Sequence, residues 1–478
     1  MDLKNSSEMA KKIIPGVLIA GVFFAGGVLA GSRISSSAGN SSLEKINTVY
    51  SVLKDRWYFG KDKENLEEEL VENALDGMTS LEEDPHTVYF DLESAQAFTQ
   101  SLSGSNVGIG FQFFMNRNNV PEVIQVFIDS PADQAGMQPG DAIVKIDDFE
   151  TNTKTSDEIV SYIKGKDGQE VSLDVLRNGE ILSFKVVPGS YDLTVSAATD
   201  GTTGELVLSN FAQSSGRDVA KALKRIKDSG ANTLILDLRD NTGGYVTAAV
   251  DVASSFLPKD SVVFQEKLAD GTVKEFKTNK QYSQVTFDQI VILQNERTAS
   301  ASEIIIGALK DNLPEGMVTT IGNTSYGKGT EQTAMPFEDG TSLKYTIAEW
   351  VTPKGTSING VGFTPDVKIE ENPVRTAIYY NFPEEEVIEA DSVHPNAAAL
   401  QQFLQYLGYN ADRTDSYFSP ASSEALKKFQ EEHGLEATGN ADKNAFDALV
   451  KEVGLKLNEE RTAVDDQYQA AKNYLNQK

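Results

Sequence analysis

The sequence predicts a multidomain α/β chain. Residues 233–238 (TLILDL) and 289–293 (QIVIL) are nearly continuous apolar runs, which are typical of strands buried in a parallel sheet. Each run leads through a polar loop into a helical pattern, so strands and helices alternate over residues 191–371. Shorter strand patterns precede this region, and amphipathic helices follow it. With 478 residues, the chain has room for roughly three domains.

The composition excludes several classes of function. There are 71 acidic and 43 basic residues and a formal charge of −28, so we expect no nucleic-acid partner, because clustered lysine and arginine bind phosphate backbones. The absence of cysteine excludes thiol catalysis, disulfides and thiolate metal sites. The three histidines, His86, His394 and His433, are widely separated, which argues against a histidine-ligated metal. We therefore predict neither a metal nor a cofactor.

The N-terminus carries one long apolar segment. Residues 13–31 contain no charge, and their length is close to the roughly 20 residues that span a bilayer as a helix. Lysines gather before this segment, which predicts a cytoplasmic N-terminus (residues 1–12), a transmembrane helix (residues 13–31) and an extracytoplasmic remainder. Small residues at 25–32 favour a cleaved signal peptide as the alternative. Both interpretations place the remaining chain outside the cytoplasm.

Two regions lie between this segment and the α/β region. Residues 43–103 form a helical region, because apolar residues recur there at helix spacing. Residues 104–190 contain short strands, and Asn178-Gly179 between two of them is a strong hairpin signal. The region therefore reads as a small β-rich domain.

Small hydroxyl residues begin an apolar helix at residues 297–312 (RTASASEIIIGALKDN). Ser300 and Glu303 have the spacing of a capping box, in which the serine satisfies orphan amides of the first helical turn. The same position suits a nucleophile, because the helix dipole and the free amides stabilise developing negative charge. These residues alone leave both interpretations open.

Two glycine-containing loops offer partners for a nucleophilic serine. Gly243 and Gly244 follow the strand at 233–238, where they form either a tight turn or a pair of amides that point at an oxyanion. Lys328 stands between two glycines, as either a solvated loop residue or a buried general base. No histidine occurs in the α/β region, so a Ser-His-Asp triad is not expected there, and Lys328, with Gln332 four residues on, is the candidate base.

A glycine motif opens the β-rich region. Gly108, Ile109, Gly110 and Phe111 could form a nest of amides for a peptide's terminal carboxylate, or a plain glycine turn. Together with SPADQAGM at 130–137 and GDAI at 140–143, they resemble a PDZ domain of the bacterial protease type. The resemblance implies a groove in which a ligand's C-terminal segment adds as a strand beside residues 110–113.

These motifs, in this order, resemble the carboxy-terminal processing peptidases, also called tail-specific proteases. The match covers roughly residues 43–371 and includes DPHTVYF (84–90), NTGG (241–244), TASASE (298–303), GKGT (327–330), KYT (344–346) and GFTPD (362–366). Two departures are visible. Thr298 stands where the family's nucleophile motif usually opens with serine, and residues 312–320 make the segment before Lys328 a few residues longer.

The resemblance implies roles for particular residues. Ser300 falls on the family's nucleophile, with Ser302 as the less favoured choice, Lys328 falls on its general base and Gln332 on the glutamine that orients the lysine. Asp311 matches a supporting aspartate, and the oxyanion would be held by amides of Gly243 or Gly244 with that of Ala301.

The C-terminal part begins with an acidic, irregular segment, 372–391, that predicts a linker. Residues 392–455 contain three amphipathic helices and resemble a three-helix peptidoglycan-binding domain, on ALKKFQ (425–430), GL (434–435) and TGNAD (438–442). A generic helical bundle for dimer contacts is the alternative. The helical tail, 456–478, resembles the family's closing helix, so we expect it to return to the core.

The expected protein is thus an N-terminal transmembrane helix, a helical arm, a PDZ domain before an α/β protease core, and a wall-binding domain. Its expected function is that of a membrane-anchored extracytoplasmic serine endopeptidase that cleaves protein or peptide substrates. The PDZ domain would tether a substrate's C-terminus or switch the site on, and the terminal helices could support a homodimer. The alternative is an inert cell-wall scaffold.

Overall fold

The computed structural model describes residues 41–103, 105–164, 166 and 168–477. It separates the chain into two compact units, one ending at Ser80 and the other beginning at Leu81. The predicted transmembrane helix, residues 13–31, and the predicted cytoplasmic segment before it lie outside the described residues. None of the helices that the structure does describe is long and apolar enough to cross a membrane.

The first unit consists of helices. Its elements are α2 (Ser41–Arg56), the 3-10 helix η3 (Tyr58–Asp62) and α3 (Leu66–Thr79). An ion pair of 2.6 Å between Lys54 and Glu67 joins α2 to α3. Many of its apolar side chains remain exposed, among them Leu43, Ile46, Val49, Val52, Tyr58, Phe59, Val71 and Met78.

The second unit contains a six-stranded sheet that forms the α/β core. Its order is β10-β11-β12-β15-β16-β19, and every neighbouring pair is parallel except β10 with β11. The strands are β10 (Val195–Asp200), β11 (Thr203–Leu208), β12 (Thr233–Asp237), β15 (Gln289–Gln294), β16 (Val318–Gly322) and β19 (Val367–Lys368). The two apolar runs became the adjacent central strands β12 and β15, in agreement with the sequence.

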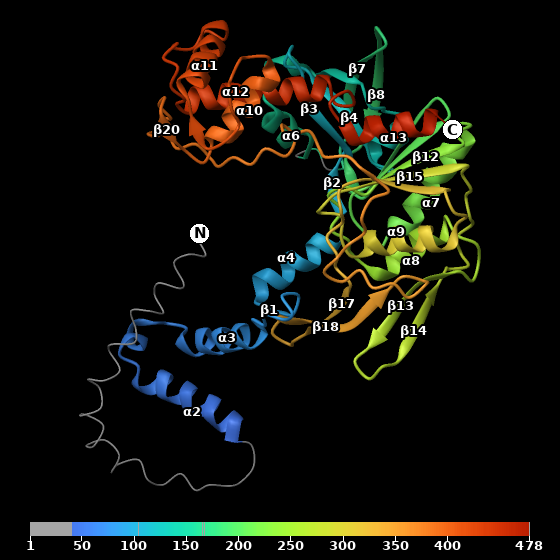
Figure 1. Ribbon diagram of the computed structural model, residues 1–478, viewed down its shortest axis with the longest axis vertical. Coiled ribbons are helices and arrows are strands. Elements are labelled where there is room, and N and C mark those ends of the chain that lie inside the picture. The colour runs from blue at the N-terminus through green and yellow to red at the C-terminus, as the bar shows by residue number, and fades with distance from the viewer. Residues whose placement is uncertain (1–40, 104, 165, 167, 478) are drawn as a thin grey trace. The chain divides into compact units, whose positions relative to one another are not determined.

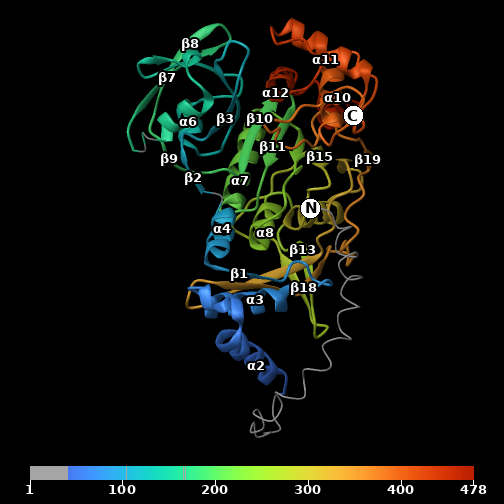
Figure 2. The same cartoon turned by 90° about the vertical axis from the view of Figure 1, so that its left-hand side faces the viewer.

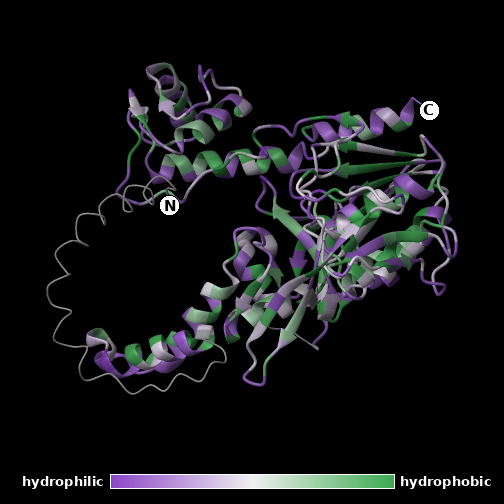
Figure 3. Ribbon diagram, turned by 60° about the horizontal axis from the view of Figure 1, so that its bottom comes forward, coloured by the Kyte–Doolittle hydropathy of each residue, from purple (hydrophilic) through white to green (hydrophobic). Residues whose placement is uncertain are grey.

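Helices cover both faces of this sheet (Figure 1). On one face lie α7 (Ser215–Asp228), α8 (Val246–Ser254) and α9 (Ala301–Asn312), which share a core with Leu234 and Leu236. On the other face lies α13 (Asp466–Asn476), whose Ala471 and Leu475 pack with Ile235 of the same strand. Side chains alternate along a strand, so a strand buried on both faces must be apolar throughout. Figure 3 shows the apolar strands beside the C-terminal helix.

A second sheet lies on the far side of α8 and α9 (Figures 1 and 2). Its order is β1-β18-β13-β14, and β17 also pairs with β18. The strands are β1 (Val88–Phe90), β13 (Val262–Leu268), β14 (Val273–Lys277), β17 (Thr330–Pro336) and β18 (Ser342–Val351). Helix α9 is therefore enclosed between two sheets, which explains why each of its residues from Ala301 to Leu309 is buried.

In the sequence, the β-rich region lies between β1 and the strands of the α/β core. It follows α4 (Leu92–Ser103) and has the sheet order β3-β4-β5-β7-β8, with β6 paired to β5. Its elements are β2 (Ser105–Gly108), β3 (Phe111–Met115), β4 (Pro121–Val126), α5 (Pro131–Ala135), β5 (Ala142–Ile146), β6 (Phe149–Glu150), η4 (Thr151–Thr153), α6 (Ser156–Lys164), β7 (Val171–Arg177), β8 (Glu180–Val186) and β9 (Gly189–Asp192). The predicted hairpin forms between β7 and β8, with φ of 51° at Asn178 and 85° at Gly179.

The C-terminal helices have a core of their own. The elements are β20 (Ser392–Val393), α10 (Ala397–Leu407), β21 (Tyr417–Phe418), α11 (Pro420–Glu432) and α12 (Lys443–Glu459). Residues 372–391 contain neither helix nor strand, but Val374, Phe382 and Ile388 are buried in the core of these helices. This segment is therefore packed against the domain that follows it.

Candidate active site

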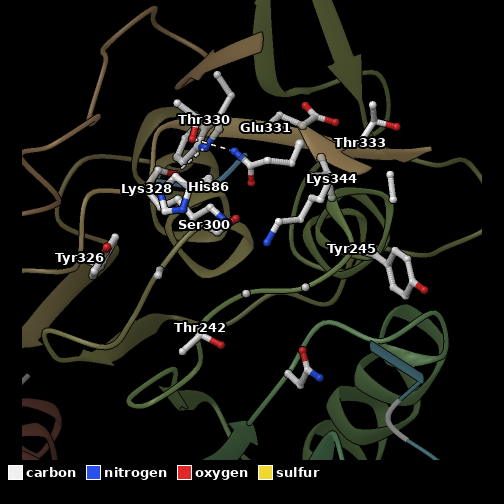
Figure 4. Close-up of a pocket in the computed structure, with 18 of the residues that line it drawn as sticks. His86, Thr242, Tyr245, Ser300, Tyr326, Lys328, Thr330, Glu331, Thr333 and Lys344 are labelled. Atoms are coloured by element: carbon white, nitrogen blue, oxygen red, sulfur yellow. Dashed lines mark hydrogen bonds between the residues drawn. The ribbon is translucent and has the colours of Figure 1, made fainter. Parts of the chain in front are cut away.

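A cavity of roughly 790 Å³ lies where α9 begins, between the core and the second sheet (Figure 4). The predicted residues Ser300, Lys328, Gln332, Gly243 and Gly244 line it, together with His86, Tyr245, Arg297, Glu331 and Lys344. The cavity thus brings together both glycine-containing loops and the start of the apolar helix. Ala301 is fully buried directly behind the serine.

Ser300 occupies a strained backbone position at the start of α9. Its φ is 57° and its ψ is −115°, a conformation that non-glycine residues seldom adopt and that costs of order 1–3 kcal/mol. The side chain is 9% exposed and faces the cavity. Ser302, in contrast, is fully buried and donates a hydrogen bond of 2.9 Å to the carbonyl of Asn241. Of the two serines, Ser300 is the one that a substrate can reach.

Glu303 joins Ser300 to the loop that carries Lys328, residues 323–329 between β16 and β17, called the lysine loop below. Its carboxylate accepts hydrogen bonds from the backbone N–H of Ser300 (2.8 Å), Gly327 (2.7 Å) and Lys328 (2.9 Å), and from the hydroxyl of Ser325 (2.6 Å). Burial raises the pKa of Glu303, and the four donors oppose that rise. The sequence predicts Glu303 as the partner in a capping box, but its contacts with the lysine loop depend on the tertiary fold.

The lysine loop lies close against its neighbours, as its glycines allow. A Cβ added to Gly327 would lie 2.7 Å from the backbone nitrogen of Gly362, and one added to Gly329 would lie 2.6 Å from Cβ of Asn359. Lys328 is held between them and is partly buried. Burial lowers the pKa of Lys328 and the positive charge of Lys344 lowers it further, whereas the Glu303 carboxylate acts in the opposite direction.

Gln332 lies in the cavity but does not contact the lysine through its amide nitrogen. Its Nε2 donates to the hydroxyls of Thr330 (2.9 Å) and Thr346 (3.1 Å). The Thr346 hydroxyl in turn donates to Asp84 (3.0 Å), in the turn before β1. The glutamine is therefore fixed by β18 and by the turn that precedes the second sheet.

Of the three backbone amides predicted to hold the oxyanion, one already donates a hydrogen bond within the chain and two do not. The N–H of Gly243 donates to the side chain of Asn241 at 2.9 Å. The amides of Gly244 and Ala301 make no hydrogen bond with any part of the chain that the structure describes. A Cβ at Gly243 would lie 2.8 Å from Cβ of Ser300, so only glycine fits beside the serine. Among the described residues, the N–H groups of Gly244 and Ala301 are therefore the ones not already engaged.

Asp311 lies outside the cavity. Its carboxylate accepts the backbone N–H of Lys354 at 2.8 Å and lies 3.8 Å from the ammonium of the same residue. Lys354 belongs to the turn after β18. The contacts of Asp311 therefore hold the end of α9 to the second sheet.

The glycine motif of the β-rich region lies between β2 and β3. Ile109 is buried, and Gly110 has a φ of 92° that suits glycine, with Ser130 so close that a Cβ would meet it at 2.2 Å. Phe111 begins β3, which is the edge strand of its sheet. An extended peptide can therefore add beside β3, at the position that the sequence predicts.

His86 is the residue that the sequence analysis missed. No histidine occurs within the α/β region, but the pairing of β1 with β18 brings His86 into the cavity from outside it. Burial lowers the pKa of His86, and the charge of Lys328 lowers it further, whereas the nearby Asp84 carboxylate acts in the opposite direction. Its position in the DPHT motif, ahead of a strand, was the available signal.

Comparisons with known protein families match four separate segments of the chain. Family models match residues 28–94 (Activating protease CtpB N-terminal domain), 107–187 (PDZ domain), 202–369 (Peptidase family S41) and 393–449 (peptidoglycan-binding domain). The α/β core, the β-rich region and the helices within residues 393–449 thus each match one family model.

Whole-chain relatives agree with these matches. A CtpA-like serine protease of Staphylococcus epidermidis is 31% identical over 429 residues, 89% of this chain and 85% of its own. The carboxy-terminal processing proteases CtpA and CtpB of Bacillus subtilis are 30% and 29% identical, over 92% and 89% of this chain and 92% and 88% of theirs. The match to peptidase family S41, together with relatives named as serine proteases and carboxy-terminal processing proteases, defines a serine peptidase. The chain belongs to the carboxy-terminal processing proteases of peptidase family S41.

Proposed function

We propose that this protein is a serine endopeptidase that works with a Ser300–Lys328 dyad. Neutral Lys328 accepts the Ser300 proton as the serine oxygen bonds to the scissile carbonyl carbon. The amides of Gly244 and Ala301 hold the oxyanion, and loss of one such donor typically costs about 3 kcal/mol of barrier. The lysine returns the proton to the leaving amine as the C–N bond breaks. Water then hydrolyses the acyl-enzyme ester.

One observation carries this proposal. The Glu303 carboxylate binds the backbone of Ser300 and of Lys328 together, while both side chains face the same cavity. A single buried group thus fixes nucleophile and base relative to each other, as proximity catalysis requires. Gln332 of β17 lines the same cavity, and since its amide nitrogen is engaged by Thr330 and Thr346, its proposed role of orienting the base falls to its amide oxygen.

The test is peptide cleavage together with covalent labelling by a fluorophosphonate. Ser300→Ala should abolish both, and Lys328→Ala should abolish cleavage, because serine is a weak nucleophile without its base. Ser302→Ala is the matched control and should retain substantial activity. Labelling that survives Ser300→Ala but vanishes in Ser302→Ala would overturn the nucleophile, and full activity in Lys328→Ala would overturn the dyad.

His86 is the competing base, because it lines the same cavity and burial lowers its pKa, which favours the neutral imidazole. We expect His86→Gln to keep most of the activity that Lys328→Ala loses. The reverse result, an inactive His86→Gln beside an active Lys328→Ala, would assign the base to histidine. The inert scaffold remains the alternative function, and it predicts no Ser300-dependent turnover at all.

The surroundings of the enzyme are proposed from sequence. Residues 13–31 would anchor it in the membrane with the catalytic unit outside, and the matched C-terminal domain would bind peptidoglycan. Protease added to intact protoplasts should then degrade the catalytic unit, and full protection would contradict the orientation. Sedimentation of the full chain with purified peptidoglycan tests the wall contact.

The helical first unit supports the proposed homodimer. Ile46 and Val49 of α2 and Val71 of α3 are exposed apolar side chains, which monomeric proteins seldom gather in one small unit. Light scattering should give a dimer mass for the wild type and a monomer mass for an Ile46→Glu/Val49→Glu variant. A monomeric wild type would refute the dimer.

A further inference from the structure

The cavity brings together nitrogen bases from three segments of the chain. His86 comes from the turn before β1, Lys328 from the loop before β17, and Lys344 from β18. Figure 4 shows the Lys344 side chain entering the cavity with its amine directed toward Ser300. Protonated groups that share one partly desolvated cavity disfavour one another, so the three bases compete for protons.

Lys344 has the surroundings that best hold a positive charge. Its Nζ lies 5.1 Å from the ring centroid of Phe90 on β1 and 5.1 Å from that of Phe98 on α4. The two rings also stack on each other, with centroids 5.1 Å apart, which fixes their positions beside the ammonium. Aromatic faces attract a cation through their quadrupole. Burial lowers the pKa of Lys344, and the nearby Asp84 carboxylate opposes that shift.

The register of the second sheet fixes where this charge lies. Lys344 is paired with Val88 on one side and with Ala334 of β17 on the other. Its position is therefore determined by backbone hydrogen bonds to two neighbouring strands. A side chain rooted in the middle of a sheet places its charge more reproducibly than one on a loop.

Lys328 has different surroundings. The acid that faces it is Glu303, whose carboxylate is already engaged by four hydrogen-bond donors. The other titratable groups that act on it are Lys344 from β18 and His86, and both are bases. A proton in this cavity is therefore better accommodated on Lys344 than on Lys328.

We propose that Lys344 is a positioning residue for the reaction, whose fixed ammonium keeps the Lys328 amine unprotonated and ready to accept the Ser300 proton. The inference rests on the proposed Ser300–Lys328 dyad and names the group that activates Lys328 as its base. It explains how a lysine acts as a base near neutral pH, since a neighbouring cation is one of the means by which an amine is activated.

The test is the pH dependence of kcat/KM with an uncharged peptide. In Lys344→Met the acid limb should move to higher pH by about one to two units, because the like charge that disfavours protonated Lys328 is gone. Activity near pH 7 should fall correspondingly and recover at alkaline pH. Lys344→Arg keeps a cation and should keep the wild-type acid limb. The matched control is Lys280→Met, which removes an exposed lysine and should leave the profile unchanged.

A slower Lys344→Met enzyme with the wild-type acid limb would overturn the proposal, since a purely structural role lowers the rate without moving the profile. If thermal unfolding shows that Lys344→Met does not fold, Lys344→Gln is measured in its place and judged by the same shift. Lys328→Ala separates the two inferences. Full activity in Lys328→Ala refutes the dyad, whereas an inactive Lys328→Ala beside an unshifted Lys344→Met refutes only the role of Lys344.

Discussion

Replacing Glu303 by glutamine should disable the enzyme while leaving the shape of the side chain intact. The native carboxylate accepts four hydrogen bonds, two on each oxygen. An amide keeps one acceptor oxygen and turns two N–H groups toward the donors that faced the other. The Oε2 partners, Ser300 and Lys328, are both backbone N–H groups, so the amide nitrogen is better tolerated at Oε1, where the Ser325 hydroxyl can reverse its role.

The magnitude follows from this arrangement. Gly327 loses its acceptor, and a buried unsatisfied N–H costs about 1–3 kcal/mol. The bonds from Ser300 and Lys328 change from a charged to a neutral acceptor, a loss of about 1 kcal/mol each. The total loss of folding free energy is about 3–5 kcal/mol, and it falls on the hydrogen bonds that position the proposed nucleophile and base. A displacement of about 1 Å there costs on the order of 100-fold in rate.

The assay is kcat/KM for peptide cleavage beside thermal unfolding. Glu303→Gln should lose at least about 100-fold in kcat/KM, and the Tm should fall by roughly 10 °C at about 2–4 °C per kcal/mol. Glu315→Gln, an exposed glutamate in the turn after α9, is the control and should change neither quantity. A Glu303→Gln enzyme within threefold of wild type would refute the idea that this carboxylate fixes the dyad.

Three further outcomes are expected. Burial, and then the hydrogen bond and charge of Glu266, raise the pKa of Glu331 from 4.5 to about 8. The stability that the protonated Glu331 contributes is therefore present at low pH and lost as the pH rises through about 8. Glu331→Gln should raise the Tm relative to wild type at pH 9 and not at pH 5. Asp465→Asn removes the charge of a 2.7 Å partner of the buried Arg239 and should cost about 2–3 kcal/mol in denaturant unfolding; an unchanged free energy of unfolding would show that Asp237 alone compensates the arginine. A peptide with a free C-terminus should bind at residues 108–111 at least about tenfold more tightly than its amide by fluorescence anisotropy, and equal binding would refute the amide nest.

The sequence was sufficient where one segment determines its own structure. The apolar runs at 233–238 and 289–293 are typical of strands covered on both faces, and they are the centre of the main sheet. The hairpin at Asn178-Gly179 follows from local turn chemistry in the same way. The return of the C-terminal tail to the core rested on the family resemblance, and α13 does cover the second face of that sheet.

The sequence was insufficient where contacts depend on sheet pairing. No periodicity indicates that β1 pairs with β18, and this pairing is what places His86 beside Lys328 and Phe90 beneath Lys344. The engaged amide of Gly243 is a different case. An asparagine two residues before a backbone N–H commonly accepts it, so Asn241 carried the signal that this donor is occupied.

A helix cap and a nucleophile at Ser300 are compatible interpretations, because the capping partner Glu303 also helps to hold the strained backbone of the proposed nucleophile. Glu303 satisfies the serine's own N–H and thereby helps to hold the backbone at a φ of 57°, which would cost of order 1–3 kcal/mol if nothing compensated it. Burial of α9 between two sheets supplies the rest of that compensation, since the helix cannot shift to relax its first residue without disturbing both. The same carboxylate then reaches the lysine loop. Glu303 thus binds the backbone of both residues of the proposed dyad, and its substitution should therefore affect stability and catalysis together.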